Sequence, residues 1–489
     1  MEYELIAAVD MGSNSFRLQV ARVVGDQIYP LDSLKESVRL AAGLRSDKTL
    51  DVDSQARGIA ALTQFGERLR GFDPLAVRAV ATNTLRVARN APQFLAAAEA
   101  ALGFPIDVIA GREEARLIYI GVAHSLPSSS DRRLVVDIGG GSTEFIIGRA
   151  VEPLLTESLY MGCVSYTLRF FPSGKVDAAR FREAEIAAAR ELENIAHEYL
   201  NMGWDVAVGS SGTAREIEEI IDQNGLNPGR QSGITRVGLE RLKASLIKAG
   251  SAERLNLPGM RADRIPVLPG GLAILSAVFE FFELEHMSYG DGALRLGVLY
   301  DLLGRFHHHD MRDATIAQFM QRYQVDRAQA QRVESLALDI YRQLVPDSGT
   351  ERDEAKHFLG WAARVHEIGI SIAHSAYHKH GAYILTFADM PGFSKKDQGR
   401  LAFLVLGHRG KLEKISGMAR DEREWQLVFA LRLAALFNRA RHGDAPDVAV
   451  RRLSKGFRLR LPEGWLEKNS MTAGALDDEV RSWRSVGFE

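Results

Sequence analysis

The sequence predicts an α/β fold in which two related halves precede a helical region and a short strand-containing end. A motif that begins with Asp and continues with Gly and Ser occurs twice, at residues 10–16 and again at residues 137–145. Strands and helices alternate in the pattern up to residue 125, which is typical of α/β domains. From residue 307 onward the pattern becomes almost continuously helical. These three observations define the expected fold class.

Each copy of the repeated motif follows an apolar run, residues 5–9 in the first copy and residues 134–136 in the second. Such a run predicts a buried strand, and the glycines after it predict a tight turn. Glycine tolerates positive φ and lets backbone N–H groups approach an anion, while Ser, Thr and Asn add further donors. Asp10 and Asp137, at the strand ends, are placed to hold a metal ion or its water shell. Two facing turns of this kind would hold one phosphate group and its Mg²⁺ between them.

A single Asp-x-Gly turn is weak evidence, because structural turns of α/β domains often have the same composition. Two well-separated copies, each after an apolar strand, favour a functional pair. The pairing resembles the phosphate-1 and phosphate-2 loops of the actin, sugar kinase and Hsp70 superfamily. The resemblance implies two actin-like (ribonuclease H-like) domains with a phosphate site in the cleft between them.

Length and composition exclude several classes of protein. The chain has 489 residues, of which 46% are hydrophobic and 25% charged, as expected for a globular protein of about three or four domains. Its acidic start predicts no signal peptide, and no apolar run reaches the length of about 18 residues that a membrane span needs. The only cysteine, Cys163, lies in an apolar context and is expected to be a buried residue of a reducing cytoplasm rather than a nucleophile. The net charge of −2 argues against a general nucleic-acid-binding protein, although local basic stripes could still attract a polyanion.

The first half continues with helices and one short strand. Residues 94–102 are Ala-rich and predict a helix, and residues 105–109 predict a strand. Residues 112–123 predict a helix with acids in its first turn, where the helix dipole favours them. The polar stretch at residues 127–131 predicts the first domain boundary.

The second half repeats the α/β pattern. A long helix is expected at about residues 178–200, followed by a strand at residues 206–208. A third Gly-rich turn at residues 209–213 then opens a helix, and it occupies the place where kinases of the superfamily bind adenosine. Helix starts with Gly and Ser can bind anions, but a plain strand-to-helix turn remains an alternative. Further helices are expected to open at residues 269–271 and at residues 290–293.

The C-terminal part predicts a helical region that ends in a basic strand pair at about residues 447–461. Its basic residues suggest a groove for a long anion, and a solvated face is the alternative. The residues expected to form this groove are Arg451, Arg452, Lys455 and Arg458. The expected domains are residues 1–125, 126–304, 305–445 and 446–489.

Several short motifs make a more specific match. They are residues 8–16, 81–86 (Ala-Thr-Asn-Thr-Leu-Arg), 111–119 (Gly-Arg-Glu-Glu-Ala-Arg-Leu-Ile-Tyr), 136–144, 161–165, 209–213 and 291–295 (Asp-Gly-Ala-Leu-Arg). Together they resemble the exopolyphosphatase/guanosine pentaphosphate phosphohydrolase (Ppx/GppA) family, and the full-length form is most similar to proteobacterial exopolyphosphatases. The Gly-x-Glu-Glu-Ala-Arg helix start is the most diagnostic of them, because kinases of the superfamily lack it.

This resemblance implies an exopolyphosphatase, which releases orthophosphate processively from the end of inorganic polyphosphate. The alternative within the family is a guanosine pentaphosphate (pppGpp) 5′-phosphohydrolase. The resemblance also implies dependence on Mg²⁺, stimulation by K⁺, a homodimer and a cytoplasmic location, with attachment to the inner membrane face left open. An ATP-dependent kinase and a non-enzymatic binder of polyphosphate or alarmone are the rivals from other classes. The binder would be expected if the carboxylates were missing, and they are present.

The same match assigns roles to residues of the cleft. Glu114 is expected to be the general base that activates water, while Asp137 and Glu144 act on the metal and the attacking water. Glu113 is expected to be a surface acid that favours the helix dipole. Asp10, Asp137 and Glu144 are the expected metal ligands. The residues expected to bind phosphate are Ser13, Asn14, Ser15, Arg86, Gly139, Gly140, Gly141, Ser142, Thr143, Gly209, Ser211, Gly212 and Thr213.

A weaker resemblance concerns the helical region. Residues 366–369 (His-Glu-Ile-Gly), 378–385 and 407–409 (Gly-His-Arg) resemble the HD phosphohydrolase fold. A working site of that kind needs His-Asp where this chain has His366 and Glu367, and it needs a later Asp that residues 431–436 do not supply. We therefore expect an HD-like helical domain without an intact metal site. The run His307, His308 and His309 is expected to be solvated rather than metal-binding.

Overall fold

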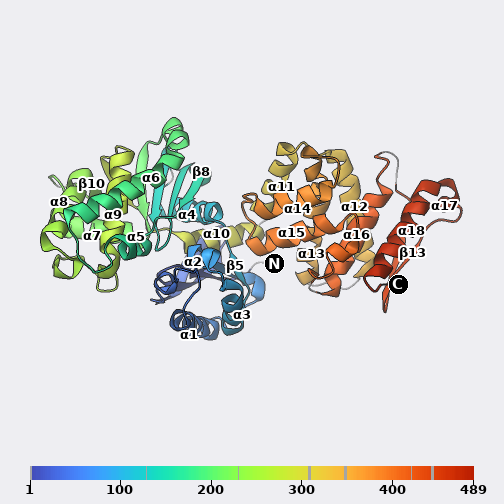
Figure 1. Ribbon diagram of the computed structural model, residues 1–489, viewed down its shortest axis with the longest axis horizontal. Coiled ribbons are helices and arrows are strands. Elements are labelled where there is room, and N and C mark those ends of the chain that lie inside the picture. Colours follow the sequence, from blue (N-terminus) through green and yellow to red (C-terminus); the bar gives the residue numbers. More distant parts are fainter. Residues whose placement is uncertain are drawn as a thin grey trace. The chain divides into compact units, whose positions relative to one another are not determined.

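The computed structural model describes residues 3–127, 129–229, 231–306, 310–345, 350–419, 421–441 and 445–488. The chain forms two compact units, Met1–Asp310 and Met311–Glu489. The first unit holds both expected α/β halves (Figure 1). The histidine run at residues 307–309 lies outside the described residues.

The first half is built on a mixed sheet with the strand order β3-β2-β1-β4-β5. Its strands are β1 (Leu5–Met11), β2 (Phe16–Val24), β3 (Gln27–Glu36), β4 (Val77–Ala81) and β5 (Ile106–Val108). Its helices are α1 (Val52–Arg68), α2 (Asn83–Val87) and α3 (Ala91–Leu102). Apolar residues such as Phe65 on α1 and Phe94 on α3 pack with Phe16 of β2 in one buried cluster, so these helices cover one face of the sheet. The outer face of the first half is thus closed.

The second half has a larger sheet with the order β10-β11-β9-β6-β7-β8. Its strands are β6 (Arg132–Ile138), β7 (Thr143–Arg149), β8 (Glu152–Leu159), β9 (Val206–Ser210), β10 (Ile234–Thr235) and β11 (His286–Tyr289). The helices on its outer side are α5 (Cys163–Phe170), α6 (Ala178–Met202), α7 (Ser211–Gln223), α8 (Arg236–Ala249) and α9 (Leu268–Phe281). Cys163 is buried in this core, which confirms the expectation from its apolar context.

Helices α4 (Gly111–Ser125) and α10 (Leu294–Phe306) lie between the two sheets (Figure 1). Their apolar residues share one cluster with Val80 of the first sheet and Val135 of the second. A Cβ added at Gly121 would collide with the carbonyl oxygen of Ala293, and one at Gly297 would collide with that of Leu117. Only glycine permits this backbone-to-backbone packing, so the two helices form the close link between the halves.

The two halves repeat one arrangement, which confirms the predicted fold class. In each half an antiparallel hairpin carries the motif turn, β1–β2 in the first and β6–β7 in the second. The first strand of each hairpin also pairs in parallel with a later strand, β1 with β4 and β6 with β9. Asp10 and Asp137 are both the penultimate residues of their strands. Their cross-strand partners differ, because Asp10 lies opposite Arg17 whereas Asp137 lies opposite Glu144.

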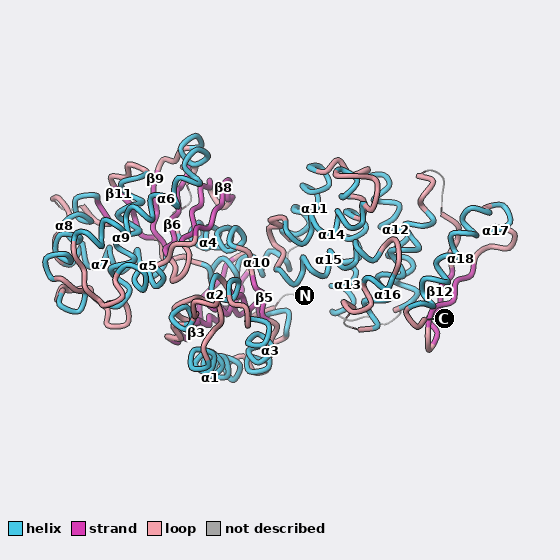
Figure 2. Tube along the Cα trace, viewed as in Figure 1, coloured by secondary structure: helices cyan, strands magenta, loops and turns pink. Residues whose placement is uncertain are grey.

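The second unit is helical, and strands occur in its described part only in the hairpin β12 (Ala449–Leu453) and β13 (Gly456–Arg460) (Figure 2). Its helices are α11 (Met311–Arg322), α12 (Arg327–Leu344), α13 (Thr350–Val365), α14 (Tyr377–Phe387), α15 (Lys395–Gly407), α16 (Glu422–Phe437), α17 (Trp465–Lys468) and α18 (Ser470–Ser485). Phe457 of the hairpin stacks on Phe429 of α16 with ring centroids 4.0 Å apart. This packing joins the hairpin to the helical core, and the expected separate domain at residues 446–489 stays a prediction.

Short 3₁₀ helices complete the fold. They are Leu40–Gly43, Pro74–Ala76, Ala252–Arg254, Ile265–Val267, Ile368–Ser371 and Leu412–Lys414. In the described part of the chain, none of the helices combines the length and apolarity that a bilayer crossing requires.

Candidate active site

The two motif turns face each other across a cavity of about 370 Å³ inside the first unit. A cavity of this size is typical of sites for small molecules. The turns themselves are in direct contact. A Cβ at Gly140 would lie 3.0 Å from Cβ of Ser13, and one at Gly141 would lie 2.6 Å from Oδ1 of Asn83. Thr84 also donates a hydrogen bond to Ser13 at 2.8 Å, so the turn of the first half is held from behind.

Most of the predicted phosphate-binding residues line this cavity. Those that line it are Ser13, Asn14, Ser15, Gly139, Gly140, Ser142, Ser211 and Gly212. Those that are absent from its lining are Arg86, Gly141, Thr143, Gly209 and Thr213. Thr143 is fully buried and donates to the carbonyl oxygen of Met161, so its hydroxyl is already used. The sequence pattern therefore located the turns but could not separate their lining residues from their supporting ones.

All the predicted catalytic and metal-binding carboxylates line the same cavity. Asp10 and Asp137 come from the strand ends, Glu144 from β7 and Glu114 from the first turn of α4. Glu144 is only 1% exposed, and its neighbour Phe145 points into the hydrophobic core. This alternation follows from strand geometry, because successive side chains point to opposite faces of a sheet. The fold thus gathers acids from four separate elements around one space.

Glu114, Asp137 and Glu144 are buried and Asp10 is half-buried, and the loss of solvent is the main cause of their altered pKa values. Burial raises the pKa of Asp137 to about 6, and the charges of Glu114 and Asp10 add to the increase. Burial also raises the pKa of Glu144 well above its ordinary value, with Glu114 and Asp137 as the next causes. The pKa of Glu114 is raised by burial and lowered in part by Arg86. The cavity therefore holds negative charge that the protein itself does not fully offset.

Glu114 and Glu144 each have a specific partner. Nη1 of Arg86 donates to Oε2 of Glu114 at 2.7 Å and to the carbonyl oxygen of Ile109 at 3.1 Å. Ser158 donates to Oε1 of Glu144 at 2.8 Å. Arg86 thus orients Glu114 in this structure, and its expected contact with phosphate stays a prediction.

The expectation that Glu113 is a surface acid is wrong. Its side chain is buried and accepts two hydrogen bonds from Arg116, at 2.7 and 2.8 Å. Arg116 also pairs with Asp301 of α10, which in turn pairs with Arg78 of β4. The sequence could not reveal this burial, because Arg78 and Asp301, which complete the network around Glu113 and Arg116, come from distant parts of the chain.

The carboxylates fit a hydrated magnesium ion. No group of three or more His, Cys, Asp or Glu side chains arranged to hold a metal occurs within the described residues. Mg²⁺ keeps several waters and needs only one or two carboxylates besides phosphate oxygens, so a dispersed set is suitable. The mutually raised pKa values of these acids also indicate a place where a cation would be stabilised. Asp10 and Asp137, with Glu144, are the residues that would hold it.

Basic side chains that the sequence analysis did not assign also line the cavity. They are Arg17, Lys35, Arg215, Arg261, Arg264 and Arg295. Arg295 begins the first turn of α10, and its Nε is buried without a hydrogen-bond partner in the described structure. The net charge of −2 is a sum over the whole chain, so it gives no sign of this cluster of basic residues. The six residues come from both halves and lie close together only in the folded protein. Arg295 is the last residue of the motif at residues 291–295, so the sequence analysis located it. The motif alone did not assign a role to its side chain.

The third Gly-rich turn supports the second motif turn. Ser211 has a left-handed backbone with φ of 68° and donates to the carbonyl oxygen of Ile138 at 3.1 Å. Thr213 donates to the same oxygen at 2.9 Å and accepts a hydrogen bond from Arg264 at 2.8 Å. Ser211 and Gly212 therefore face the cavity while Thr213 fixes the turn.

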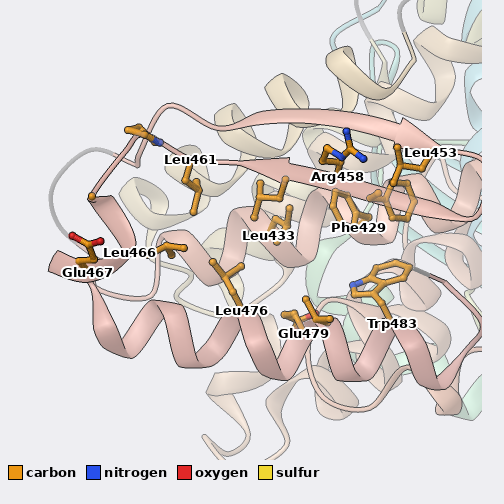
Figure 3. A pocket seen from close by; sticks show the side chains of 15 residues that line it. Phe429, Leu433, Leu453, Arg458, Leu461, Leu466, Glu467, Leu476, Glu479 and Trp483 are labelled. Atoms are coloured by element: carbon orange, nitrogen blue, oxygen red, sulfur yellow. The ribbon is translucent and has the colours of Figure 1, made fainter.

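A second, larger cavity of about 580 Å³ lies in the C-terminal unit, between the hairpin and α18 (Figure 3). Its walls are mainly apolar, and Leu433, Leu461, Leu476 and Trp483 surround it. Arg458 is the only one of the expected polyphosphate-groove residues among the side chains found to line it. The expected groove stays a prediction, and this cavity is not suited to a long anion because its walls are apolar.

The HD-like histidines lie in the helical core of the same unit. His366, His378 and His408 are buried, with the ring centroids of His366 and His408 5.3 Å apart. Glu367, which stands where a metal-binding Asp would be needed, instead forms an ion pair with Arg441 at 2.6 Å. The acid at this position is therefore engaged by a cation.

Taken together, the two sheets and the repeated hairpins define a protein of the actin-like fold class with an acid-lined cavity between its two motif turns. The family model of the Ppx/GppA phosphatase family matches residues 19–306, and that of its domain III matches residues 311–480. The chain therefore belongs to the Ppx/GppA phosphatase family.

Curated relatives match the whole chain. A guanosine-5′-triphosphate,3′-diphosphate pyrophosphatase of Aeromonas hydrophila is 37% identical over 489 residues, which are 99% of this chain and 98% of the relative. A protein of the same name from Pseudoalteromonas translucida is 38% identical over 487 residues, which are 99% and 97% of the two chains. These names favour the guanosine pentaphosphate alternative over the leading exopolyphosphatase interpretation.

Solved structures match about three fifths of the chain. A PPX-GPPA enzyme of Aquifex aeolicus has a TM-score of 0.51 and 26% identity, covering 60% of this chain and 98% of its own. An exopolyphosphatase of Cytophaga hutchinsonii has a TM-score of 0.56 and 24% identity, covering 62% and 98%. The second likeness supports the fold alone.

Proposed function

We propose that this protein hydrolyses the terminal phosphoanhydride bond of guanosine 5′-triphosphate 3′-diphosphate and releases orthophosphate. The observation that carries the proposal is the cavity in which buried carboxylates and basic side chains converge around two phosphate-type turns. Carboxylates activate water and hold a cation, while Arg and Lys bind phosphate oxygens. The names of the full-length relatives favour a guanosine substrate.

Glu114 would be the general base of the reaction. Its carboxylate takes the proton of a water molecule as that water attacks the terminal phosphorus, and the bond to the leaving phosphate oxygen breaks. Burial raises the pKa of Glu114, which makes it a better proton acceptor, while the charge of Arg86 favours its ionised form. Products are orthophosphate and the nucleotide shortened by one phosphate.

The remaining side chains would bind and neutralise the phosphates. Backbone N–H groups of the turns and the hydroxyls of Ser13 and Ser142 surround the reacting group, and Arg17 and Arg295 offset the charge of the remaining phosphates. Mg²⁺ bound near Asp10 and Asp137 would neutralise the charge that develops in phosphoryl transfer. Activation by K⁺, a homodimer and a cytoplasmic location stay predictions.

Inorganic polyphosphate is the second candidate substrate. It offers the same terminal phosphoanhydride, and the exposed basic face of the hairpin is an additional place where a long chain of phosphates could be bound. Both substrates would use the same cavity and the same base.

Phosphate release measured in parallel with guanosine pentaphosphate, long-chain polyphosphate and ATP tests the proposal. We expect the highest kcat/KM with guanosine pentaphosphate, a lower value with polyphosphate and little turnover of ATP. A higher kcat/KM with polyphosphate would overturn the assignment of the guanosine substrate. Preferential use of ATP would overturn the reaction class.

A further inference from the structure

An ion pair joins the two halves where the cavity meets solvent. Nζ of Lys35 on β3 donates to Oδ2 of Asp263, which lies in the loop just before the 3₁₀ helix Ile265–Val267, at 2.6 Å. Lys35 and Arg261 both line the cavity and are partly exposed, so this pair lies at its mouth. Both partners are about one-third exposed. An ion pair with this exposure is weak and can exchange for another anion.

The sheet of the first half places Lys35 in line with the reaction centre. Asp10 of β1 lies opposite Arg17 of β2, and Arg17 lies opposite Lys35 of β3. All three side chains line the cavity. Neighbouring strands are about 4.8 Å apart, so Lys35 lies roughly 10 Å from Asp10 across the sheet. That separation leaves room for a second phosphate group of the substrate beyond the one that reacts.

The row of residues across this sheet also contains a repulsive pair. Arg17 and Lys35 are directly opposite each other on antiparallel strands, and like charges in this position destabilise a sheet. An anion beside them would offset the repulsion. In this structure Asp263 supplies that negative charge to Lys35, and it also lies 3.8 Å from Arg261.

The loop that carries Asp263 is fixed to the active site. The next residue, Arg264, donates to Thr213 at 2.8 Å and lies so close to Gly212 that a Cβ there would be 2.9 Å from its Nη1. The hydrogen bond from Lys35 is the main cause that lowers the pKa of Asp263, so its carboxylate is ionised at neutral pH. The loop therefore presents a charged carboxylate at a fixed place beside two cations.

We propose that the Lys35–Asp263 pair is an exchangeable strap, and that Lys35 and Arg261 form a second phosphate subsite. A second anionic group of the substrate, separate from the phosphate chain that is hydrolysed, displaces the carboxylate of Asp263 and binds Lys35 and Arg261 in its place. This inference rests on the proposed function, in which that group is the 3′-diphosphate of guanosine pentaphosphate. Asp263 thereby determines specificity, because a substrate without a second anionic group leaves the strap closed.

Two substitutions with opposite charge effects test the subsite. Lys35→Gln removes a cation and should raise KM for guanosine pentaphosphate roughly three- to tenfold, the range for one partly exposed ion pair. Asp263→Asn removes the competing carboxylate and should lower this KM by a similar factor, with an effect that shrinks as salt is added. GTP, which has the same 5′-triphosphate but no 3′-diphosphate, should respond with a smaller change in both variants.

The same strand offers a matched control. Asp32 of β3 pairs with Arg68 of α1 at 2.5 Å, and neither residue lines the cavity. Asp32→Asn and Arg68→Gln remove one charge each from a similar surface pair, so they should leave both KM values unchanged. Titration calorimetry with guanosine pentaphosphate on wild type and Lys35→Gln adds a readout of binding that does not depend on turnover.

Equal shifts for guanosine pentaphosphate and GTP, or no shift for either, would overturn the subsite. Failure of the proposed substrate gives a different result. If the wild type prefers polyphosphate, the same variants are compared on long-chain polyphosphate and on tripolyphosphate. A larger change in KM for the long chain then supports the subsite, and equal changes overturn it.

Discussion

The buried acids of the first unit and the buried histidines of the second unit differ in what surrounds them. In the first unit, Asp10, Glu114, Asp137 and Glu144 face a common cavity, and the charges of neighbouring acids add to the raised pKa values of Asp137 and Glu144. In the second unit, polar groups of the HD-like core mostly have partners within the protein, such as the ion pair between Glu367 and Arg441. Ionisable side chains are costly to bury, so several of them around one cavity indicate a binding site for a ligand that offsets this cost.

The histidine core illustrates the opposite outcome. Nδ1 of His366 contacts the carbonyl oxygen of Ala363 at 2.7 Å, and Nδ1 of His408 contacts that of Val405 at 2.6 Å. His378 has an unpartnered Nδ1, but cations rather than carboxylates surround it. A metal ion would be repelled by these cations, so the histidines act as neutral packing groups.

The largest effect should come from the proposed base in the acid-lined cavity. Glu114→Gln keeps the shape of the side chain but cannot accept a proton from water, so we expect kcat to fall by about 10²–10⁴-fold. Steady-state phosphate release measures this fall, and calorimetric titration should show that guanosine pentaphosphate still binds. Turnover at the wild-type rate would exclude Glu114 as the base.

Metal dependence gives the next largest effect. Asp10→Asn and Asp137→Asn each remove a negative charge from the expected magnesium site, so the Mg²⁺ concentration for half-maximal rate should rise roughly 10- to 100-fold. Titration of activity with Mg²⁺ measures the change. Asp291→Asn is a suitable control, because Asp291 lines the cavity but lies on an exposed loop, and an equal change there would show a general charge effect instead.

The sequence predicted the fold because its signals are local. Apolar runs before the two Asp-Gly turns located β1 and β6, and helix starts with acids or Gly located α4 and α10. The expected helix at residues 178–200 is Ala178–Met202 in the structure, and the expected strand pair at residues 447–461 is the hairpin β12–β13. Each of these features depends on residues that are close together in the chain.

The site was predictable only in part, because its remaining residues converge from distant elements. The motif turns and the four acids were found from pattern and resemblance. Lys35, Arg261 and Arg264 were not found, since a lone cation on a strand or loop has no local signal. Glu113 was placed on the surface for a similar reason, because Arg116, to which it is bonded, also pairs with Asp301 of the distant helix α10.

The histidine core should make the stability of the second unit depend on pH. Burial lowers the pKa of His366, His378 and His408, and that of His378 falls to about 4 with Lys414 and Lys379 as further causes. In the unfolded chain these groups bind protons below about pH 6.5, whereas in the folded chain they stay neutral to lower pH. The unfolded state therefore binds more protons. The free energy of unfolding should therefore fall as the pH drops below about 6.5, and for His378 the fall is about 1.4 kcal/mol per pH unit down to about pH 4.

Tryptophan fluorescence during urea unfolding measures how the free energy of unfolding of the second unit changes with pH, because every tryptophan except Trp204 lies in that unit. His378→Gln removes one titrating imidazole, so the free energy of unfolding should change less steeply with pH. His197→Gln, at an exposed position on α6 of the first unit, should leave it unchanged. A pH dependence that is the same in both variants would contradict the assignment of His378.

The smallest effect is expected at the basic hairpin. Arg451 and Arg458 lie directly opposite each other on β12 and β13, and both are exposed. Arg452 pairs with Glu422, whereas the described residues provide no salt bridge for Arg451 or Arg458. The two unpaired arginines therefore keep their full charge for an external anion.

Reversal of both charges, Arg451→Glu with Arg458→Glu, should slow the hydrolysis of long-chain polyphosphate roughly two- to tenfold at low salt, because a distant segment of the chain is held less strongly. Added salt should remove the difference by screening, and guanosine pentaphosphate, which has no long chain of phosphates, should be hydrolysed at the wild-type rate. Arg484→Glu changes the charge of an exposed position on α18 and serves as the control. If the double variant degrades long chains as fast as the wild type at low salt, the hairpin arginines form a solvated face and no polyphosphate groove.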